Sequence, residues 1–334
     1  MIRALLIVLT AVVCASSSHS QSTLGSYLFE FQTAGDPLAI AVDSNGGIYY
    51  TVFTFSAPNA TRCYYVAAPS PETTVESHVL VSDAADTDVT AGRGFTGIAV
   101  DSQGNVFLAL ESGNAQTATV RKLSPAPDFQ PVADFFEGIV FGDKRFNGVD
   151  LMDDDTLILS TFNSVEFWDA NDSVPLFDVG GLEAFQRDVA FNPATNEIYI
   201  AKNGGDSSNS VNRLSGGSAE DPTAYTDITN GFIAQGGVNS AFGVNAQLIE
   251  YDVTDNHIYV PDYSSEQRVI AAYDPSDPSA PVATIDGSES PNGPLGAPAD
   301  CAATSDVIFI TDNSNQRIVV YGKFVNAVGE WNLY

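Results

Sequence analysis

The sequence predicts an all-β protein, a six-bladed β-propeller with four-stranded blades whose ring is closed by the N-terminal strand. Three observations lead to this fold class. One hairpin unit recurs six times, the second strand of each unit is apolar almost throughout, and no stretch of 12 residues carries the apolar stripe of an amphipathic helix. We therefore expect almost no helix and a ring of similar sheets.

Each repeat joins a short apolar strand, a turn rich in Asp, Asn and Gly, and a second apolar strand. The equivalent positions are Ile40, Ile98, Val149, Val189, Ile249 and Cys301, spaced 58, 51, 40, 60 and 52 residues apart. In turns such as 43–47 and 101–105, glycine permits positive φ and the Asx side chain bonds the local backbone, which is typical of hairpins. The second strands do not alternate apolar with polar residues, so both of their faces should be covered by neighbouring blades.

A third strand follows most hairpins, and a weaker fourth strand follows the third. The third strands are expected at 62–66, 119–123, 165–169, 211–214, 268–273 and 317–321, and the fourth at 77–81, 130–135, 174–178, 225–228 and 281–285. The last repeat lacks a fourth strand, whereas residues 27–31 lie unassigned before the first repeat. We therefore predict that the N-terminal strand completes the last blade; the competing closure would use residues 329–334. The long connections 215–245 and 286–298 are candidates for a cover over one rim.

Residues 1–20 have the pattern of a secretory signal peptide. Arg3 is the charged start, residues 4–13 are mostly apolar, and small residues stand near position 20. The apolar run is too short to span a bilayer, so we expect it to be removed. Residues 21–334 should then form a single propeller domain that is secreted.

The composition is strongly acidic. Among 334 residues, 42 are Asp or Glu and 13 are Lys or Arg, which gives a formal net charge of −29. Such a surface repels phosphate backbones and anionic lipid head groups, so we expect neither nucleic acid nor membrane as a partner. The 44% of apolar residues excludes a disordered chain. We expect a monomer whose partner is an extracellular small molecule, a glycan or a protein.

Two cysteines and two asparagines are candidates for covalent modification. Cys63 and Cys301 can form one long-range disulfide in an oxidising compartment, or they can remain two buried thiols; the sequence leaves both open. Asn59 and Asn171 begin glycosylation acceptor patterns, which matter if the source glycosylates its secreted proteins.

One stretch, IFITDNSNQRIVVYG (308–322), resembles the NHL repeat, in which an inner strand ends in Asp and is followed by Asn, an Arg-Ile pair and an apolar strand. Residues 258–274 form a looser copy, and GIAVD (97–101) and AIAVD (39–43) are typical opening strands. The wider group includes the SMP-30/gluconolactonase-like propellers, which are lactonases and esterases, and many modules that only bind. The resemblance covers nearly all of the mature chain and is specific for fold but not for function.

The resemblance to the hydrolase members implies a Ca²⁺ ion in the central channel, held by residues at the first position of the innermost strands. In this chain those positions hold Leu38, Thr96, Asn147, Arg187, Gln247 and Ala299, of which only Asn147 matches. A fixed arginine would repel a metal ion, so no cofactor is expected to be required. A register shifted by one residue would instead give an irregular metal site from Asp36, Asn147, Asp188 and Asp300.

The side chains of Thr96, Asn147, Arg187 and Gln247 are expected to present hydrogen-bonding groups at one mouth of the channel. That set suits a carboxylate, a polar glycan or a peptide terminus, unless Arg187 simply pairs with Asp188 or Asp150 and plugs a wet channel.

The histidines argue against a catalytic role. We expect His78 and His257 at the surface, away from any catalytic role, and no catalytic residue is assigned. The sequence thus favours an extracellular binding module with an unknown ligand. The alternative is a lactone or ester hydrolase of the SMP-30-like type with a degenerate channel metal site.

Overall fold

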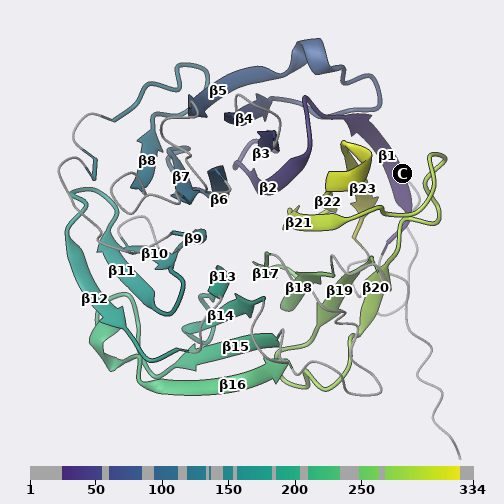
Figure 1. Ribbon diagram of the computed structural model, residues 1–334. Coiled ribbons are helices and arrows are strands. Elements are labelled where there is room, and N and C mark those ends of the chain that lie inside the picture. The colour runs from purple at the N-terminus through teal and green to yellow at the C-terminus, as the bar shows by residue number, and fades with distance from the viewer. Residues whose placement is uncertain are drawn as a thin grey trace, which may run out of the picture.

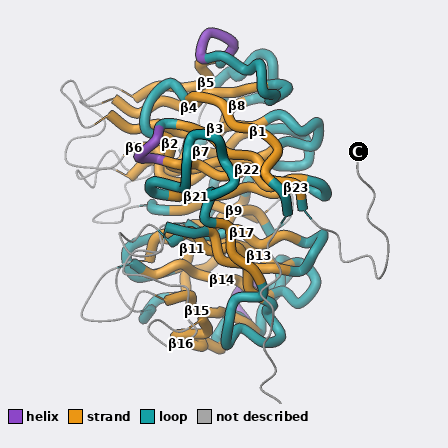
Figure 2. The backbone as a smooth tube through the Cα atoms, turned by 90° about the vertical axis from the view of Figure 1, so that its right-hand side faces the viewer, coloured by secondary structure: helices purple, strands orange, loops and turns teal. Residues whose placement is uncertain are grey.

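Six antiparallel sheets stand around a central axis like the blades of a propeller (Figure 1). The computed structural model describes residues 25–54, 60–84, 94–111, 119–132, 135–136, 146–152, 156–182, 186–203, 210–233, 248–262 and 268–323. In the edge-on view of Figure 2 the strands occupy the middle of the molecule and the turns project on both sides. The predicted fold class is confirmed.

Each blade runs from an innermost strand at the axis to an outermost strand at the perimeter. Blade 1 contains β2 (Pro37–Val42), β3 (Ile48–Thr54), β4 (Ala60–Val66) and β5 (Val79–Ala84), and blade 2 contains β6 (Gly94–Val100), β7 (Val106–Glu111) and β8 (Thr119–Leu123). Blade 3 contains β9 (Gly148–Leu151), β10 (Thr156–Ser160), β11 (Val165–Asp169) and β12 (Pro175–Val179), and blade 4 contains β13 (Gln186–Asn192), β14 (Glu197–Lys202), β15 (Ser210–Ser215) and β16 (Asp227–Ile233). Blade 5 contains β17 (Glu250–Asp252), β18 (His257–Pro261), β19 (Ile270–Tyr273) and β20 (Ala283–Ile285), and blade 6 contains β21 (Pro298–Ala303), β22 (Val307–Asp312), β23 (Arg317–Gly322) and β1 (Tyr27–Gln32).

The helical content of the described residues is three short 3₁₀ turns, as the lack of a helical stripe predicts. They are η1 (Val75–Ser77), η2 (Pro222–Ala224) and η3 (Asn313–Asn315).

Blade 2 departs from the four-stranded pattern in its described residues. Where residues 130–135 are predicted to form the fourth strand, Leu123 makes a single bridge to Pro131, and the Val132 N–H donates to the Lys122 carbonyl at 2.8 Å. Pro131 has no N–H to donate to a ladder, which weakens the pairing in this described segment.

The N-terminal strand closes the ring. Strand β1 pairs antiparallel with β23, with Phe31 opposite Ile318 and Gln32 opposite Arg317. The last blade is therefore built from both ends of the chain, which confirms the predicted closure. Residues 329–334, the competing segment, lie outside the described residues.

The hairpin turns take the predicted Asx geometry. The Asp43 Oδ1 atom accepts the N–H groups of Asn45 at 2.8 Å and Gly47 at 2.9 Å, and Asp101 Oδ1 holds its own turn in the same way. Gly46 has a φ of +79°, a left-handed conformation that glycine adopts without strain. These local bonds fix the turns independently of the rest of the ring.

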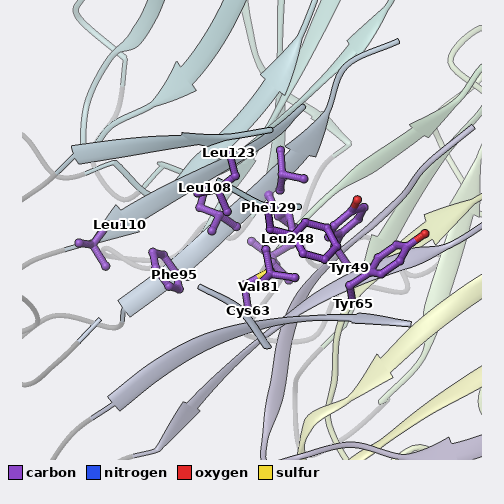
Figure 3. Packing of buried hydrophobic residues seen from close by; sticks show 13 residues of the cluster. Tyr49, Cys63, Tyr65, Val81, Phe95, Leu108, Leu110, Leu123, Phe129 and Leu248 are labelled. Atoms are coloured by element: carbon purple, nitrogen blue, oxygen red, sulfur yellow. The ribbon is translucent and has the colours of Figure 1, made fainter. Parts of the chain in front are cut away.

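The core lies between neighbouring blades, and the second strands are covered on both faces. Along β7, Leu108 and Leu110 pack toward blade 1 in the cluster that Figure 3 shows, whereas Phe107 and Ala109 pack toward blade 3. All four side chains are at most 1% exposed. A strand without alternation is thus explained by a blade on each side.

Cys63 and Cys301 are both free and buried, so the disulfide alternative is wrong for this structure. Cys63 packs in the cluster between blades 1 and 2, and Cys301 packs with residues of blades 5 and 6. Burial raises the pKa of both thiols, which keeps them protonated and unreactive.

Candidate functional site

A small pocket lies on the propeller axis, enclosed by the innermost strands of all six blades. Its volume is about 30 Å³, room for roughly two water molecules. The lining residues are Ala39, Ile40, Gly97, Ile98, Val149, Asp150, Asp188, Val189, Leu248, Ile249, Glu250 and Asp300. All of them lie in strands β2, β6, β9, β13, β17 and β21 except Leu248 and Ile249, which directly precede β17. These six strands surround the centre of the ring in Figure 1.

Four consecutive blades each place one carboxylate in this axial pocket. Asp188 of β13 and Asp300 of β21 directly precede the equivalent positions of their repeats, Val189 and Cys301. Asp150 of β9 and Glu250 of β17 directly follow theirs, Val149 and Ile249. Blades 1 and 2 contribute only apolar or small residues there, such as Ala39 and Gly97. The pocket is therefore acidic on the side formed by blades 3 to 6.

Most of these carboxylates hold the backbone of the next blade. Asp150 Oδ2 accepts the Phe191 N–H of blade 4 at 2.7 Å, and Asp188 Oδ2 accepts the Ile249 N–H before β17 at 3.0 Å. Asp300 Oδ2 accepts the Ile40 N–H of blade 1 at 2.8 Å. Each bond crosses from one innermost strand to the next, so the carboxylates join the blades around the axis.

Burial is the largest influence on these four carboxyls and raises the pKa of each above its ordinary value, for Asp150 to about 6. The neighbouring negative charges raise the pKa values of Asp188 and Glu250 further, whereas the bonds from backbone N–H groups act in the opposite direction. The cluster therefore takes up protons in mildly acidic solution.

One cation, Lys323, lies near the axial carboxylates but not among the described lining residues of the pocket. Burial lowers the pKa of Lys323 to about 8, and the Glu250 carboxylate opposes this shift. The Lys323 ammonium group contacts Asp252 and lies 3.2 Å from Asp255 Oδ2, at the hairpin turn of blade 5. Lys323 thus neutralises a turn at the edge of the cluster.

The sequence places Arg187 at the innermost position of blade 4, and the structure corrects this: a β-bulge in β13 puts Asp188 at the axis instead. Gln186 pairs with Lys202 and Asp188 with Ala201, so Arg187 is the extra residue of a bulge in β13. The bulge gives Asp188 to the axial pocket and leaves Arg187 half-buried outside its lining. Bulges recur at the same place in β2, β6 and β21.

The predicted mouth residues hold neighbouring blades together where the structure describes them. The Thr96 Oγ1 donates to the Phe146 carbonyl at 3.3 Å, and the Asn147 Nδ2 donates to the Gln186 carbonyl at 2.6 Å. Both side chains are buried. Gln247 and the glycosylation candidate Asn59 lie outside the described residues, whereas Asn171 is exposed in the turn between β11 and β12.

The four residues of the irregular calcium site, Asp36, Asn147, Asp188 and Asp300, do not come together at the axis. Asp188 and Asp300 line the pocket, but Asn147 is bonded to blade 4 and Asp36 accepts from Gln316 Nε2 at 2.7 Å. Ca²⁺ takes six to eight oxygen ligands. Within the described ranges, no three His, Cys, Asp or Glu side chains are grouped as a metal ion requires.

Sequence reasoning did not assign Glu250 to the axis and named Asp150 only as a possible partner of Arg187. Each of the two acids lies between apolar neighbours, in VDL of blade 3 and IEY of blade 5, at the same position of the repeat. That recurrence is a usable signal, because an acid in a strand covered on both faces needs either a partner or a pocket.

The comparisons with known proteins support the fold and give no information on the axial pocket. No family model matches the chain, and no curated protein matches its sequence. A chain in the crystal structure of the nidogen/laminin complex is 11% identical with a TM-score of 0.56, over 82% of this chain and 89% of that one. Hydrazine synthase of Kuenenia stuttgartiensis is 11% identical with a TM-score of 0.54, over 93% of this chain and 99% of that one.

In the described part of the chain, no helix has the length and apolar character to cross a membrane. At identities this low, the likeness to solved structures concerns the arrangement of the backbone. By its fold, the chain is a β-propeller.

Proposed function

We propose that this chain is a secreted, NHL-like β-propeller that acts as an extracellular binding module, with the ligand bound at a rim and not at the axis. The observation that carries the proposal is the use of the axial carboxylates. Asp150, Asp188 and Asp300 each accept a backbone N–H of the following blade, so these groups serve ring closure.

The size of the axial pocket supports the same function. Pockets for organic ligands measure roughly 300–1,000 Å³, whereas this pocket has a volume of about 30 Å³. A lactone, an ester or a sugar is larger than that space. The axis therefore suits water, and a ligand of those classes would meet the loops and strand ends of a rim.

The hydrogen bonds of the motif residues support the NHL-like assignment. In the stretch 308–322, the Arg317 Nε atom donates to Asp312 Oδ2 at 2.9 Å, and the Asn313 Nδ2 donates to the Pro37 carbonyl of blade 1 at 3.0 Å. Asn313 of the motif thus joins the last blade to the first, whereas the Arg317–Asp312 pair lies within the last blade. One structural neighbour was solved in a complex of two proteins, nidogen and laminin, which is consistent with a protein partner for the rim.

The competing function is a lactone or ester hydrolase with a calcium ion in the channel. The test is the thermal unfolding of the purified protein in EDTA and in millimolar Ca²⁺, together with Asp300→Asn and, as a control, the exposed Asp172→Asn. A binding module of the proposed kind should show the same melting temperature in both solutions.

A calcium site would instead stabilise the fold by about 2.7 kcal/mol at a hundredfold excess over Kd. A clear calcium-dependent rise in melting temperature that Asp300→Asn removes and Asp172→Asn keeps would contradict the binding-module proposal and support the hydrolase. Turnover of simple lactones by the calcium-loaded protein would do the same.

A further inference from the structure

His78 lies at the seam between the first and last blades, not free at the surface as the sequence predicts. It follows η1 in the connection to the outermost strand of blade 1. Its ring meets Phe31 of β1 edge-on with the centroids 5.9 Å apart, and it meets Tyr50 of β3 edge-on at 5.5 Å. Phe31 and Tyr50 are at most 4% exposed. One imidazole thus contacts both the closing strand and the blade next to it.

A hydrogen bond links this imidazole to the chain that leaves the closing strand. The Tyr50 Oη and His78 Nδ1 atoms are 2.6 Å apart, and the Ala34 N–H donates to the same Tyr50 oxygen at 3.2 Å. Since the hydroxyl oxygen already accepts an amide, its own proton is available for His78 Nδ1. With the hydroxyl as donor, the imidazole is neutral and carries its proton on Nε2; the reversed hydrogen bond would place that proton on Nδ1.

The surroundings of His78 oppose a second proton. His78 Nε2 is buried and has no hydrogen-bond partner among the residues that the structure describes. Burial lowers the pKa of His78, and only Glu76, on its own connection, acts in the opposite direction. The facing groups of β1, the β1–β2 link and β3 are a phenyl ring, a backbone amide and a phenol.

The acids of β1 and of the β1–β2 link have other partners. Glu30 of β1 lies 2.9 Å from Arg317 Nη1, and Asp36 accepts from Gln316. A protonated imidazole would therefore lose its acceptor function toward Tyr50 and place a charge between the Phe31 and Tyr50 rings, in half-buried surroundings.

We propose that His78 is an acid-sensitive latch on the N-terminal strand: the neutral imidazole ties blade 1 to β1, and protonation of the ring opens this contact and loosens the closing strand. The latch is independent of the proposed binding function. Because the ordinary pKa of histidine is about 6.5 and the folded value is lower, the latch is fully closed above that pH and weakens as the pH falls below it.

The test is hydrogen exchange of the β1 amides at pH 7.5, 6.5 and 5.5, expressed as protection relative to an unfolded peptide at the same pH. The variants are His78→Phe, which keeps a ring that cannot titrate, and His257→Phe as the matched control at a hairpin turn. The wild type and His257→Phe should lose protection in Tyr27–Gln32, by up to about tenfold per pH unit in the titrating range. His78→Phe should show no such loss.

A local measurement is needed because the axial carboxylates change global stability in the opposite direction with pH. Equal pH dependence of β1 protection in the wild type and His78→Phe would overturn the latch. If His78→Phe does not fold, a nuclear magnetic resonance titration of the wild-type imidazoles decides the matter: a His78 midpoint below about 6.5 supports the latch, and a midpoint at or above it contradicts the latch.

Discussion

Carboxylates are buried in two regions, the closing seam, where β1 and β23 complete the last blade beside blade 1, and the axial pocket. The two regions compensate the negative charge in different ways. At the seam, Arg317 is 1% exposed and lies between Glu30 and Asp312, with a nitrogen–oxygen distance of 2.9 Å to each. Its Nη2 also donates to the carbonyls of Gly293 at 2.8 Å and Pro294 at 2.9 Å.

At the axis, four carboxylates share a pocket with no Lys, Arg or His among its described lining residues. Their charge is offset by backbone N–H groups and, in mild acid, by protons. The seam therefore depends on one cation, whereas the axis depends on pH.

The largest expected effect is at the seam. Arg317→Met leaves Glu30 and Asp312 buried without their cation, and breaking a buried pair in this way costs about 3–5 kcal/mol. Urea unfolding at pH 7 measures the loss. The control is Arg213→Met, since Arg213 pairs with Glu197 at 3.1 Å but is 27% exposed and should cost less than about 1 kcal/mol. Equal stability of the two variants would show that the seam does not rely on its ion pair.

A smaller effect is expected from crowding the axis. At Gly148 an added Cβ would lie 2.5 Å from the Asp188 Cα, a backbone atom that cannot move aside without shifting β13. Gly148→Ala should therefore destabilise the ring by roughly 1–3 kcal/mol in urea unfolding. Gly180→Ala is the matched control, because nothing lies within 4 Å of its added Cβ. Two equally stable variants would mean that the blades are not in close contact at the axis.

The smallest effect is a change in pH dependence. The pKa of Asp150 is raised to about 6 in the fold, so its contribution to stability is fully present below about pH 4 and is lost as the pH rises through 6. Asp150→Asn keeps an acceptor for the Phe191 N–H but does not titrate.

The Asn variant should therefore be more stable than the wild type at pH 8, and this advantage should shrink by about 1 kcal/mol at pH 5. Urea unfolding at both pH values tests this. For Asp172→Asn, which removes an exposed charge, the difference in stability from the wild type should be the same at both pH values. A parallel pH dependence of Asp150→Asn and the wild type would contradict the proton uptake at the axis.

Much of the fold was predictable because its signals are local. Residues 106–110 form an unbroken apolar strand, and the structure buries it between two blades. The Asp43 turn closes through bonds within five residues. The closing strand at 27–31 followed from a missing partner in the last blade.

The details that failed depend on distant contacts. His78 is held by Phe31 and Tyr50 from two other strands. This outcome is not visible in the residues next to His78.

The amino-acid sequence alone determined the repeat, the strands, the turns and the identity of the strand that closes the ring, because periodicity and turn chemistry act over a few residues. Only the tertiary structure decided which side chains reach the axis. The bulge at Arg187 shifts β13 by one residue and gives Asp188 to the pocket. A side chain changes face with each residue along a strand, and the packing of one blade against the next selects the register.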